Sequence, residues 1–331
     1  MAAAFSIRHT PVRRVKAGII ALVLGVGALT GCEKSPPPAL RIGVVEWLGQ
    51  QPLALAAERG WFAGAPVKLI DYPAGTQVQR ALRNGVIEAA VVTLDEMILL
   101  SQSVPDILTV LVLDISHGCD VVLARSPIAA MSGLRGKRIG YESQAVGSFV
   151  LARALDRSGL RPEDVTLVPL PSDQHEKSFR SGEVDAIVTF EPAASRLADV
   201  GGHVVWDSSD APGEILDLLV VRKSYLDAHP AVVASVVEGW FKGCDFLQAN
   251  PAEAHAWIAS RLHLTSTQVE AASGGLRFPC RSDNRLLLGG PSPGLKATAV
   301  RVSRVMASHG LLPAGSSTGE ILDPRVAAFI R

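Results

Sequence analysis

Short apolar runs alternate with helix-like segments from Leu40 onward, and this alternation is the feature that most restricts the possible folds. Apolar runs bounded by turn residues are typical of buried strands, whereas Ala and Leu at helical spacing over about ten residues indicate helices. The first part of the chain therefore predicts strands at 40–45, 67–70, 89–92 and 107–113 and helices at 51–60, 76–84 and 94–101. Strands that alternate with helices in this way form βαβ units around a mainly parallel sheet.

The same alternation begins again after Ala124 and predicts a second α/β unit. The pattern favours strands at 138–141, 165–169, 186–189 and 204–206 and helices at 146–158, 174–181 and from Pro192. The apolar run 215–222 is long enough to carry the chain back to the first unit. Beyond it the spacing predicts helices at 230–250, 251–262, 266–273 and 295–309.

This layout predicts an α/β clamshell of two lobes, each a mainly parallel sheet flanked by helices. Lobe 1 is expected to be discontinuous and to comprise residues 40–125 and 215–331, with residues 126–214 forming lobe 2. A ligand cleft is expected between the lobes, because two-lobed folds of this kind close around ligands by hinge motion.

The first 31 residues have the composition of an export signal. Four basic residues, within 8–16, precede an uncharged apolar run at 17–31 that is shorter than the roughly 20 residues of a spanning helix. The run ends in Leu29-Thr30-Gly31-Cys32, which resembles the lipobox of bacterial lipoproteins, where the cysteine is acylated. We therefore predict a lipoprotein signal peptide at 1–31, a lipid anchor on Cys32 and a stiff tether at 32–39, with an ordinary signal as the alternative. The protein is then exported and held at a bacterial membrane, at its periplasmic face or at the cell surface.

Charge and cysteine content exclude several classes of function. The chain has 32 basic and 32 acidic residues, and loss of the signal leaves 28 against 32, a net charge of −4. Nucleic acid is therefore not an expected partner, because its recognition needs a basic surface. Cys119, Cys244 and Cys280 remain, and although a Cys244–Cys280 bridge is possible, we expect all three to be buried free thiols. The densest group of metal-ligating residue types is 117–120, with no second cluster, so no metal and no cofactor are expected.

The stretch Asp-Ile-Ser-His-Gly-Cys-Asp at 114–120 separates two apolar runs and contains two carboxylates and a hydroxyl. Side chains at the carboxyl ends of strands face the ligand cleft in open α/β sheets. We therefore expect this stretch to form the floor of the cleft and the exit into the second lobe.

Five stretches together resemble the type II periplasmic substrate-binding proteins of nitrate/sulfonate/taurine-type ABC importers, and the likeness extends over nearly all of 40–331. The stretches are WLGQQPLALAAERGWF at 47–62, NGVIEAAVVT at 84–93, DISHGCD at 114–120, LRGKRIGY at 134–141 and GEVDAIVTFEP at 182–192. The resemblance implies a monomeric, non-enzymatic binding protein that captures a small polar nitrogen- or sulfur-containing solute by lobe closure. It also implies permease and ATPase subunits as partners, to which the solute is delivered.

Position by position, the resemblance places the ligand after strands 1, 3 and 4 of the first lobe and after the strands of the second lobe. The candidate ligand contacts are Glu46, Trp47, Thr93, Asp114, Ser116, Asp120, Tyr141, Ser143, Gly147 and Glu191. Four of them have a structural alternative. Trp47 could pack in the core, Thr93 could cap its helix, and Asp114 could be tied to backbone amides. Glu191 could do no more than favour the helix start at Pro192.

These candidates are rich in carboxylates, and no Lys or Arg stands at an obvious strand end, so a bare anion would be repelled unless backbone amides outweighed the carboxylates. We expect a neutral, cationic or zwitterionic ligand, such as an amine, an amino-sulfonate or a pyrimidine precursor of thiamine. Two alternatives stay open: an enzyme on the same fold that acts on a pyrimidine or thiamine-precursor compound, and a tethered sensor that presents its ligand to a receptor. The sequence offers no nucleophile–base pair or phosphate loop in support of the enzyme.

Overall fold

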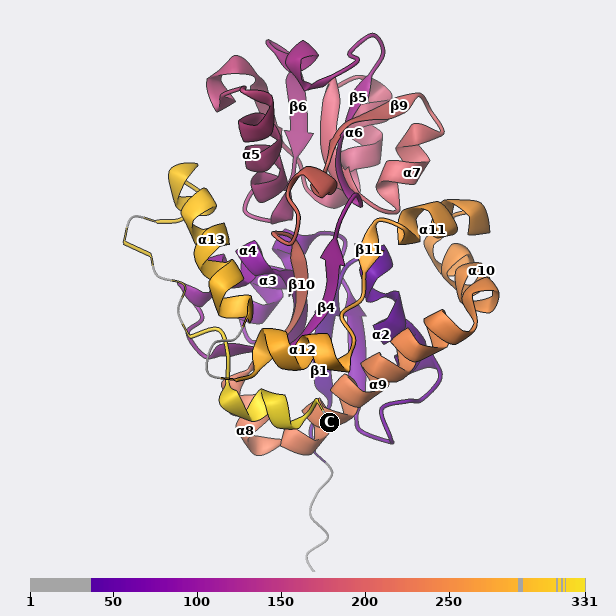
Figure 1. The fold of residues 1–331 in the computed structure, drawn as a ribbon, viewed down its shortest axis with the longest axis vertical. Helices are drawn as coiled ribbons and strands as arrows, with labels where there is room; N and C mark the ends of the chain where they lie inside the picture. Colours follow the sequence, from indigo (N-terminus) through magenta and orange to yellow (C-terminus); the bar gives the residue numbers. More distant parts are fainter. Residues whose placement is uncertain (1–36, 291–293, 314, 317, 319, 331) are drawn as a thin grey trace, which may run out of the picture. The chain divides into compact units, whose positions relative to one another are not determined.

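Two sheets organise the residues that the computed structural model describes, which are 37–290, 294–313, 315–316, 318 and 320–330 (Figure 1). The first sheet has the strand order β11-β4-β10-β3-β1-β2 and the second has the order β7-β6-β8-β5-β9. The first consists of β1 (Leu40–Val44), β2 (Val67–Asp71), β3 (Ala89–Thr93), β4 (Ile107–Ser116), β10 (Leu216–Arg222) and β11 (Leu276–Arg277). The second consists of β5 (Asp120–Arg125), β6 (Arg138–Tyr141), β7 (Thr166–Pro169), β8 (Ala186–Phe190) and β9 (Gly202–Asp207).

Both sheets are mixed, whereas the sequence analysis expects mainly parallel ones. In the first sheet β1 is parallel to β2 and β3, but β10 runs antiparallel to β3 and β4, between which it lies. In the second sheet β6 is parallel to β7 and β8, and β5 is antiparallel to β8 and β9. The reason is that the chain passes twice between the lobes. The first strand after each passage, β5 in lobe 2 and β10 in lobe 1, runs away from the cleft and therefore opposite to the strands that end at the cleft.

The crossing out of the first lobe lies earlier than predicted. Asp120–Arg125, which the sequence analysis assigned to lobe 1, pairs on both sides within the second sheet. The chain therefore leaves the first sheet after Ser116 and returns to it at Leu216, the start of β10. Below, lobe 1 denotes the part built on the first sheet and lobe 2 the part built on the second.

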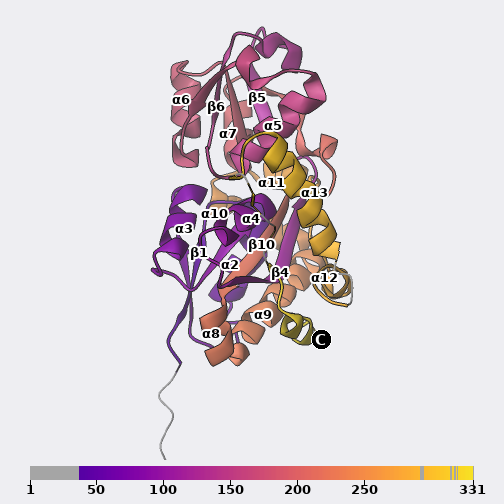
Figure 2. The same cartoon turned by 90° about the vertical axis from the view of Figure 1, so that its left-hand side faces the viewer.

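Helices cover the faces of both sheets (Figures 1 and 2). Those that follow strands are α2 (Gln51–Glu58), α3 (Gly75–Arg83), α4 (Leu94–Ser101), α5 (Val146–Ser158), α6 (His175–Ser181) and α7 (Ala193–Ala198). The later ones are α8 (Lys223–Ala228), α9 (Pro230–Ala249), α10 (Pro251–Leu262), α11 (Ser266–Ser273), α12 (Arg281–Leu288) and α13 (Gly294–Ser308). Short 3₁₀ turns are η1 (Leu48–Gln50), η2 (Met131–Leu134), η3 (Pro162–Asp164), η4 (Ser172–Gln174), η5 (Ser208–Asp210) and η6 (Pro324–Ala328). The bounds of α4, α5, α10 and α11 are those expected from sequence.

Two glycines on one face of α9 let this helix pack closely against α2 and the segment that follows α2. A Cβ added to Gly243 would lie 2.3 Å from the carbonyl oxygen of Pro52, and one added to Gly239 would lie 2.6 Å from the ring of Phe62. Because the two positions are four residues apart, they share a helix face. The close approach fixes α2, and with it the chain segment that follows β1 at the cleft.

All three described cysteines are free thiols. Cys119 is buried and Cys244 is half-buried, but Cys280 is exposed, so the expectation that all three are buried is wrong for Cys280. The residue stands at the start of α12, where its sulfur contacts the hydroxyl of Ser282 at 2.9 Å and faces solvent.

The predicted signal peptide at 1–31 and the anchor at Cys32 lie outside the described residues. Among the helices in the described ranges, none combines the length and the apolar character needed to cross a bilayer.

Candidate functional site

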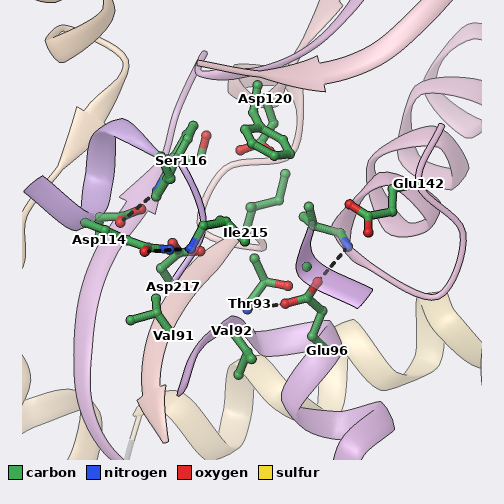
Figure 3. A pocket seen from close by; sticks show the side chains of 16 residues that line it. Val91, Val92, Thr93, Glu96, Asp114, Ser116, Asp120, Glu142, Ile215 and Asp217 are labelled. Atoms are coloured by element: carbon green, nitrogen blue, oxygen red, sulfur yellow. Dashed lines mark hydrogen bonds between the residues drawn. The ribbon is translucent and has the colours of Figure 1, made fainter. Parts of the chain in front are cut away.

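A small pocket, with a cavity volume of about 50 Å³, lies where the carboxyl ends of β1, β3 and β4 meet lobe 2 (Figure 3). The strand order explains its position, because parallel strands bring the residues that follow them to one edge of the sheet. The lining residues are Val45, Trp47, Gln50, Gly75, Val91, Val92, Thr93, Glu96, Asp114, Ser116, Asp120, Glu142, Val146, Phe190, Ile215 and Asp217.

Half of the residues predicted from sequence line this pocket. They are Trp47, Thr93, Asp114, Ser116 and Asp120. They stand at or just after the ends of β1, β3 and β4 and at the start of β5, which is where the strand pattern places them.

The other five predicted residues lie elsewhere. Glu46 forms an ion pair with Arg196, and Glu191 accepts hydrogen bonds from the backbone N–H and the hydroxyl of Ser195. Tyr141 and Ser143 line a separate cavity between α5 and the end of α13. Gly147 packs against a backbone, since a Cβ there would lie 2.9 Å from both the nitrogen and the oxygen of Glu142.

Four polar lining residues were not predicted, namely Gln50, Glu96, Glu142 and Asp217. The sequence did contain a signal for Asp217, which interrupts the apolar run 215–222 with a carboxylate. Glu96 stands three residues after Thr93, a spacing that indicates a helix cap rather than a ligand contact. Glu142 directly follows β6, one residue after the predicted Tyr141.

Three aspartates line the pocket, Asp114 and Asp217 from lobe 1 and Asp120 from the start of β5 in lobe 2. Asp217 on β10 is the pairing partner of Asp114 on β4 and of Thr93 on β3, and neighbours of this kind lie about 5 Å apart. The indole N–H of Trp47 donates to the Asp114 carboxylate at 3.2 Å. Burial, with a further contribution from the charge of Asp120, raises the pKa of Asp114 to about 7.

The other two aspartates titrate abnormally for the same reason. Burial raises the pKa of Asp120 to about 7. The pKa of Asp217 is raised well above its usual range by burial and by the neighbouring carboxylates, of which Asp114 has the largest effect. Because the charge of Asp120 raises the pKa of Asp114, and both charges raise the pKa of Asp217, ionisation of all three carboxyls near neutral pH is unfavourable without a cation.

Two glutamates stand on the opposite side of the pocket in Figure 3. Glu96 accepts hydrogen bonds from the backbone N–H of Thr93 at 3.0 Å and of Val146 at 3.3 Å. Burial and the charge of Asp95 raise the pKa of Glu96 to about 8. Glu142 accepts from both the backbone N–H and the hydroxyl of Thr76, at 2.9 and 2.7 Å. Since Val146 and Glu142 belong to lobe 2, both glutamates join the lobes.

Further contacts cross from one lobe to the other. Arg196 on α7 donates to Glu46 at 2.8 Å and to the carbonyl oxygen of Leu262 at the end of α10. Gln79 on α3 donates to the backbone carbonyl of Gln144 at 2.9 Å. The structure is thus a conformation in which the lobes meet and enclose the pocket.

The lining residues limit the chemistry that the pocket can perform. Every charged side chain among the described lining residues is acidic, and no Lys, Arg, His or Cys is present. The hydroxyl of Ser116 contacts that of Ser208 at 2.9 Å, and a hydrogen bond from Ser116 partly offsets the rise in the pKa of Asp120. Within the described ranges, no three His, Cys, Asp or Glu side chains are arranged to hold a metal ion. The arrangement is suited to binding through hydrogen-bond acceptors and apolar walls.

Comparisons with known proteins match residues 33–263 to the model of the NMT1-like family. The taurine-binding periplasmic protein of Escherichia coli K12 is 25% identical over 220 residues, which are 64% of this chain and 68% of that protein. The structure resembles the periplasmic nitrate-binding protein NrtA of Synechocystis PCC 6803 with a TM-score of 0.74 and 12% identity over 89% of each chain. It also resembles the desulfurization enzyme DSZB, with a TM-score of 0.65 and 18% identity over 89% of this chain and 99% of that one.

These structural likenesses show that the fold is that of the periplasmic binding proteins, which binding proteins and at least one enzyme share. The family match extends over well more than half of the sequence, from residue 33 to just beyond the end of α10. On that evidence the chain belongs to the NMT1-like family.

Proposed function

We propose that this chain is the substrate-binding component of an ABC importer, which captures a small polar nitrogen- or sulfur-containing solute and delivers it to a permease. The observation that carries the proposal is the pocket at the carboxyl ends of strands from one lobe, lined on its other side by residues from the second lobe. The taurine-binding and nitrate-binding names of the similar proteins support the same class of function.

Closure is proposed to occur about the two crossings between the lobes. Ser208, in the returning crossing, contacts the hydroxyl of Ser116 and accepts a hydrogen bond from the backbone N–H of Gly118 in the outgoing crossing. The two crossings are therefore coupled and can rotate as one hinge. A ligand that contacts both lobes shifts the population toward the closed form by as much as it prefers that form.

The lining residues argue against a bare anion as the solute. Five carboxyl groups face the pocket and no cationic side chain among its described lining residues offsets them. Glu96 and Glu142 use backbone amides to satisfy part of their charge, so few amide donors are left for an anionic ligand. A neutral, cationic or zwitterionic solute fits this wall.

A titration of the mature chain tests the proposed function. We expect one solute of the panel taurine, nitrate, polyamines and pyrimidines to bind with one site per chain in calorimetry, and small-angle scattering to show a smaller radius of gyration on binding. Chemical conversion of the solute during the titration would contradict a binding role and favour an enzyme. Tight binding of nitrate that survives Asp114→Ala would contradict the exclusion of anions.

The alternatives differ from this proposal in what they need from the site. An enzyme needs a nucleophile, a base or a metal beside the ligand, and the described lining residues supply only carboxylates and the hydroxyls of Thr93 and Ser116, with no His, Lys, Arg or Cys. A sensor needs the same closure as an importer component and differs only in the receptor. Importer function is therefore tested by reconstituting uptake with the permease and ATPase of the same cell.

We also propose that the mature protein is anchored through a lipid on Cys32, as the motif Leu29-Thr30-Gly31-Cys32 indicates. Export of the full chain in a bacterial host should place the protein in the membrane fraction, and Cys32→Ser should release it or leave its precursor unprocessed. Cys280→Ser is the matched control, because it removes an exposed thiol far along the chain. Equal membrane association of Cys32→Ser and the unaltered protein would contradict the anchor.

A further inference from the structure

The residues that line the pocket do more than argue against an anionic ligand, because they also indicate which class of ligand fits. We propose that it binds a small organic cation whose N–H groups donate to the carboxylates of Asp217 and Asp114, such as a protonated amine or an amidine. This inference rests on the proposed function, in that the same pocket is the solute site.

Asp217 is a buried carboxylate at the wall of the pocket. Its side chain belongs to β10, only 7% of the residue is exposed, and it lines the pocket beside Asp114 (Figure 3). Among the described residues, no side chain or backbone group donates a hydrogen bond to its carboxylate. Such a group is unfavourable unless a donor reaches it. An N–H group of a ligand in the pocket would be that donor.

The neighbouring carboxylates of Asp114 and Glu142 already accept hydrogen bonds, and these bonds leave acceptor positions open on both. One oxygen of Asp114 accepts from Trp47, and one oxygen of Glu142 accepts from Thr76. Asp114 and Asp217 therefore present free oxygens toward the same side of the pocket. A single ammonium or amidinium group carries at least two N–H donors and can meet both.

The arginines on elements around the pocket are occupied elsewhere. Arg196 on α7 pairs with Glu46 and Glu176, and Arg125 at the end of β5 lies over the ring of Phe179 and donates to a carbonyl. On the other side of the first sheet, Arg222 pairs with Asp106, Arg277 with Asp283, and Arg281 with Glu238. The remaining titratable groups near the three aspartates are Asp95, Glu96, Cys119, Glu191 and Asp207, none of which is cationic.

The rest of the wall favours an organic cation over a metal ion. The rings of Trp47 and Phe190, one from each lobe, lie edge to face with centroids 5.6 Å apart. Val91, Val92 and Ile215 add apolar surface between the two acidic sides. Aromatic rings attract alkylammonium and amidinium groups and pack against their carbon atoms.

A cation in this position should be linked to protons. The raised pKa values of Asp114 and Asp120, both about 7, mean that these carboxyls hold protons near neutral pH in the free protein. A bound cation favours their charged forms and displaces those protons, so cation affinity should rise with pH. An anion bound at the same place would give the opposite dependence.

Three ligands of matched shape test the proposal, together with larger cations. Taurine carries an ammonium and a sulfonate, isethionate replaces the ammonium with a hydroxyl, and ethanolamine replaces the sulfonate with a hydroxyl. We expect at least one of ethanolamine, 1,4-diaminobutane, guanidine and benzamidine to bind the mature protein, with severalfold higher affinity at pH 8 than at pH 6. Isethionate should not bind measurably. Calorimetry in two buffers of different ionisation enthalpy should show release of protons on cation binding.

Two other outcomes would overturn the proposal in distinguishable ways. Binding of isethionate as tightly as taurine, with no cation bound, would overturn the cation assignment and leave the binding function standing. Failure of every ligand, cationic or anionic, to bind or to close the lobes would overturn both.

Asp217→Asn keeps the shape of the side chain and removes its charge. We expect cation affinity to fall at least tenfold and proton release to decrease, while the melting temperature of the free protein rises because one carboxylate has left the cluster. We expect Asp114→Asn to lower cation affinity and proton release as well. The same result from two different variants could not be explained by a folding defect in one of them. Asp245→Asn, an exposed change on α9, is the control and should leave both properties unaltered. Cation affinity within twofold of the unaltered protein in both pocket variants would overturn the proposal.

Discussion

Replacement of Gly49 by alanine is expected to weaken solute binding about 100-fold, which corresponds to ~2.7 kcal/mol of binding free energy. A Cβ at this position would lie 2.0 Å from one carboxylate oxygen of Asp114 and 2.3 Å from the indole nitrogen of Trp47. Both of those side chains are buried at the pocket wall, so neither can move aside without leaving its place. The methyl group must separate the pair or displace η1, and either change alters the acidic side of the pocket.

The effect should appear in binding more than in folding. Gly49 has no left-handed backbone, so alanine is compatible with its conformation, and overpacking of one methyl group typically destabilises by about 1–3 kcal/mol. Calorimetric titration with a bound solute, alongside thermal unfolding, separates the two effects. Gly133→Ala is the matched control, because its added Cβ would come no closer than 3.3 Å to another atom, the Cγ2 of Ile128, and Gly133 is exposed in η2 of lobe 2. An unchanged dissociation constant for Gly49→Ala would show that the Trp47–Asp114 pair lies outside the solute site.

Local sequence patterns predicted the elements whose signals are short-range. The helix 94–101 begins after Thr93, with Glu96 at the third position, and its bounds in the structure are the same. Thr93, Asp114 and Ser116 could be placed in the cleft because each lies at or near the carboxyl end of a strand. In these cases the residue and the element that positions it are neighbours in the chain.

Residues positioned by partners distant in sequence could not be placed in the same way. Asp217 faces the pocket because β10 inserts between β3 and β4, and that strand order is not encoded in any local pattern. Tyr141 was predicted where Glu142 is found, which is a shift of one residue. Successive side chains of an extended chain point to opposite sides, so an error of one position selects the wrong residue.

The helix α12 was missed for a related reason. It lies between Pro279 and Gly289, residues that indicate a loop, and its stability comes from a contact with a remote strand. Asn284 is fully buried, accepts from the backbone N–H of Val112 at 2.8 Å and donates to the carbonyl of the same residue at 3.1 Å. Hydrogen bonds between β4 and a residue so distant in sequence can be recognised only in the three-dimensional structure.

The free protein is expected to become less stable as the pH rises from about 5 to 8, which is opposite to the usual behaviour of a protein whose carboxylates are ion-paired. The pKa of Asp95 is raised to about 6, those of Asp114 and Asp120 to about 7, and that of Glu96 to about 8, in each case mainly by burial. In the unfolded chain these groups titrate near pH 4. Between the two ranges the folded protein holds more protons than the unfolded one, so its free energy of unfolding falls with rising pH.

The magnitude follows from the number of protons held. Each extra proton lowers the free energy of unfolding by ~1.4 kcal/mol per pH unit, so one net proton between pH 5 and 7 gives a loss of ~3 kcal/mol. His175 has the opposite effect on the pH dependence of stability. Burial lowers its pKa to about 4, so below pH 6.5 the unfolded chain binds a proton that the folded protein does not. The free energy of unfolding contributed by this residue therefore falls as the pH decreases. The four raised carboxyls outnumber this single histidine. Ion-paired Asp185, with its pKa lowered to about 2, matters only below pH 4.

Scanning calorimetry of the ligand-free protein at pH 5, 6.5 and 8 should therefore show a melting temperature that falls by about 5–10 °C over the range. The double variant Asp114→Asn/Asp120→Asn should flatten the profile, since it removes two of the protons that the folded state holds. A melting temperature that rises from pH 5 to pH 8 would mean that these carboxyls are ionised in the folded protein. In that case a cationic partner must already neutralise them. A saturating cationic solute should flatten the profile as well, because it neutralises the same charges by binding to the folded protein alone.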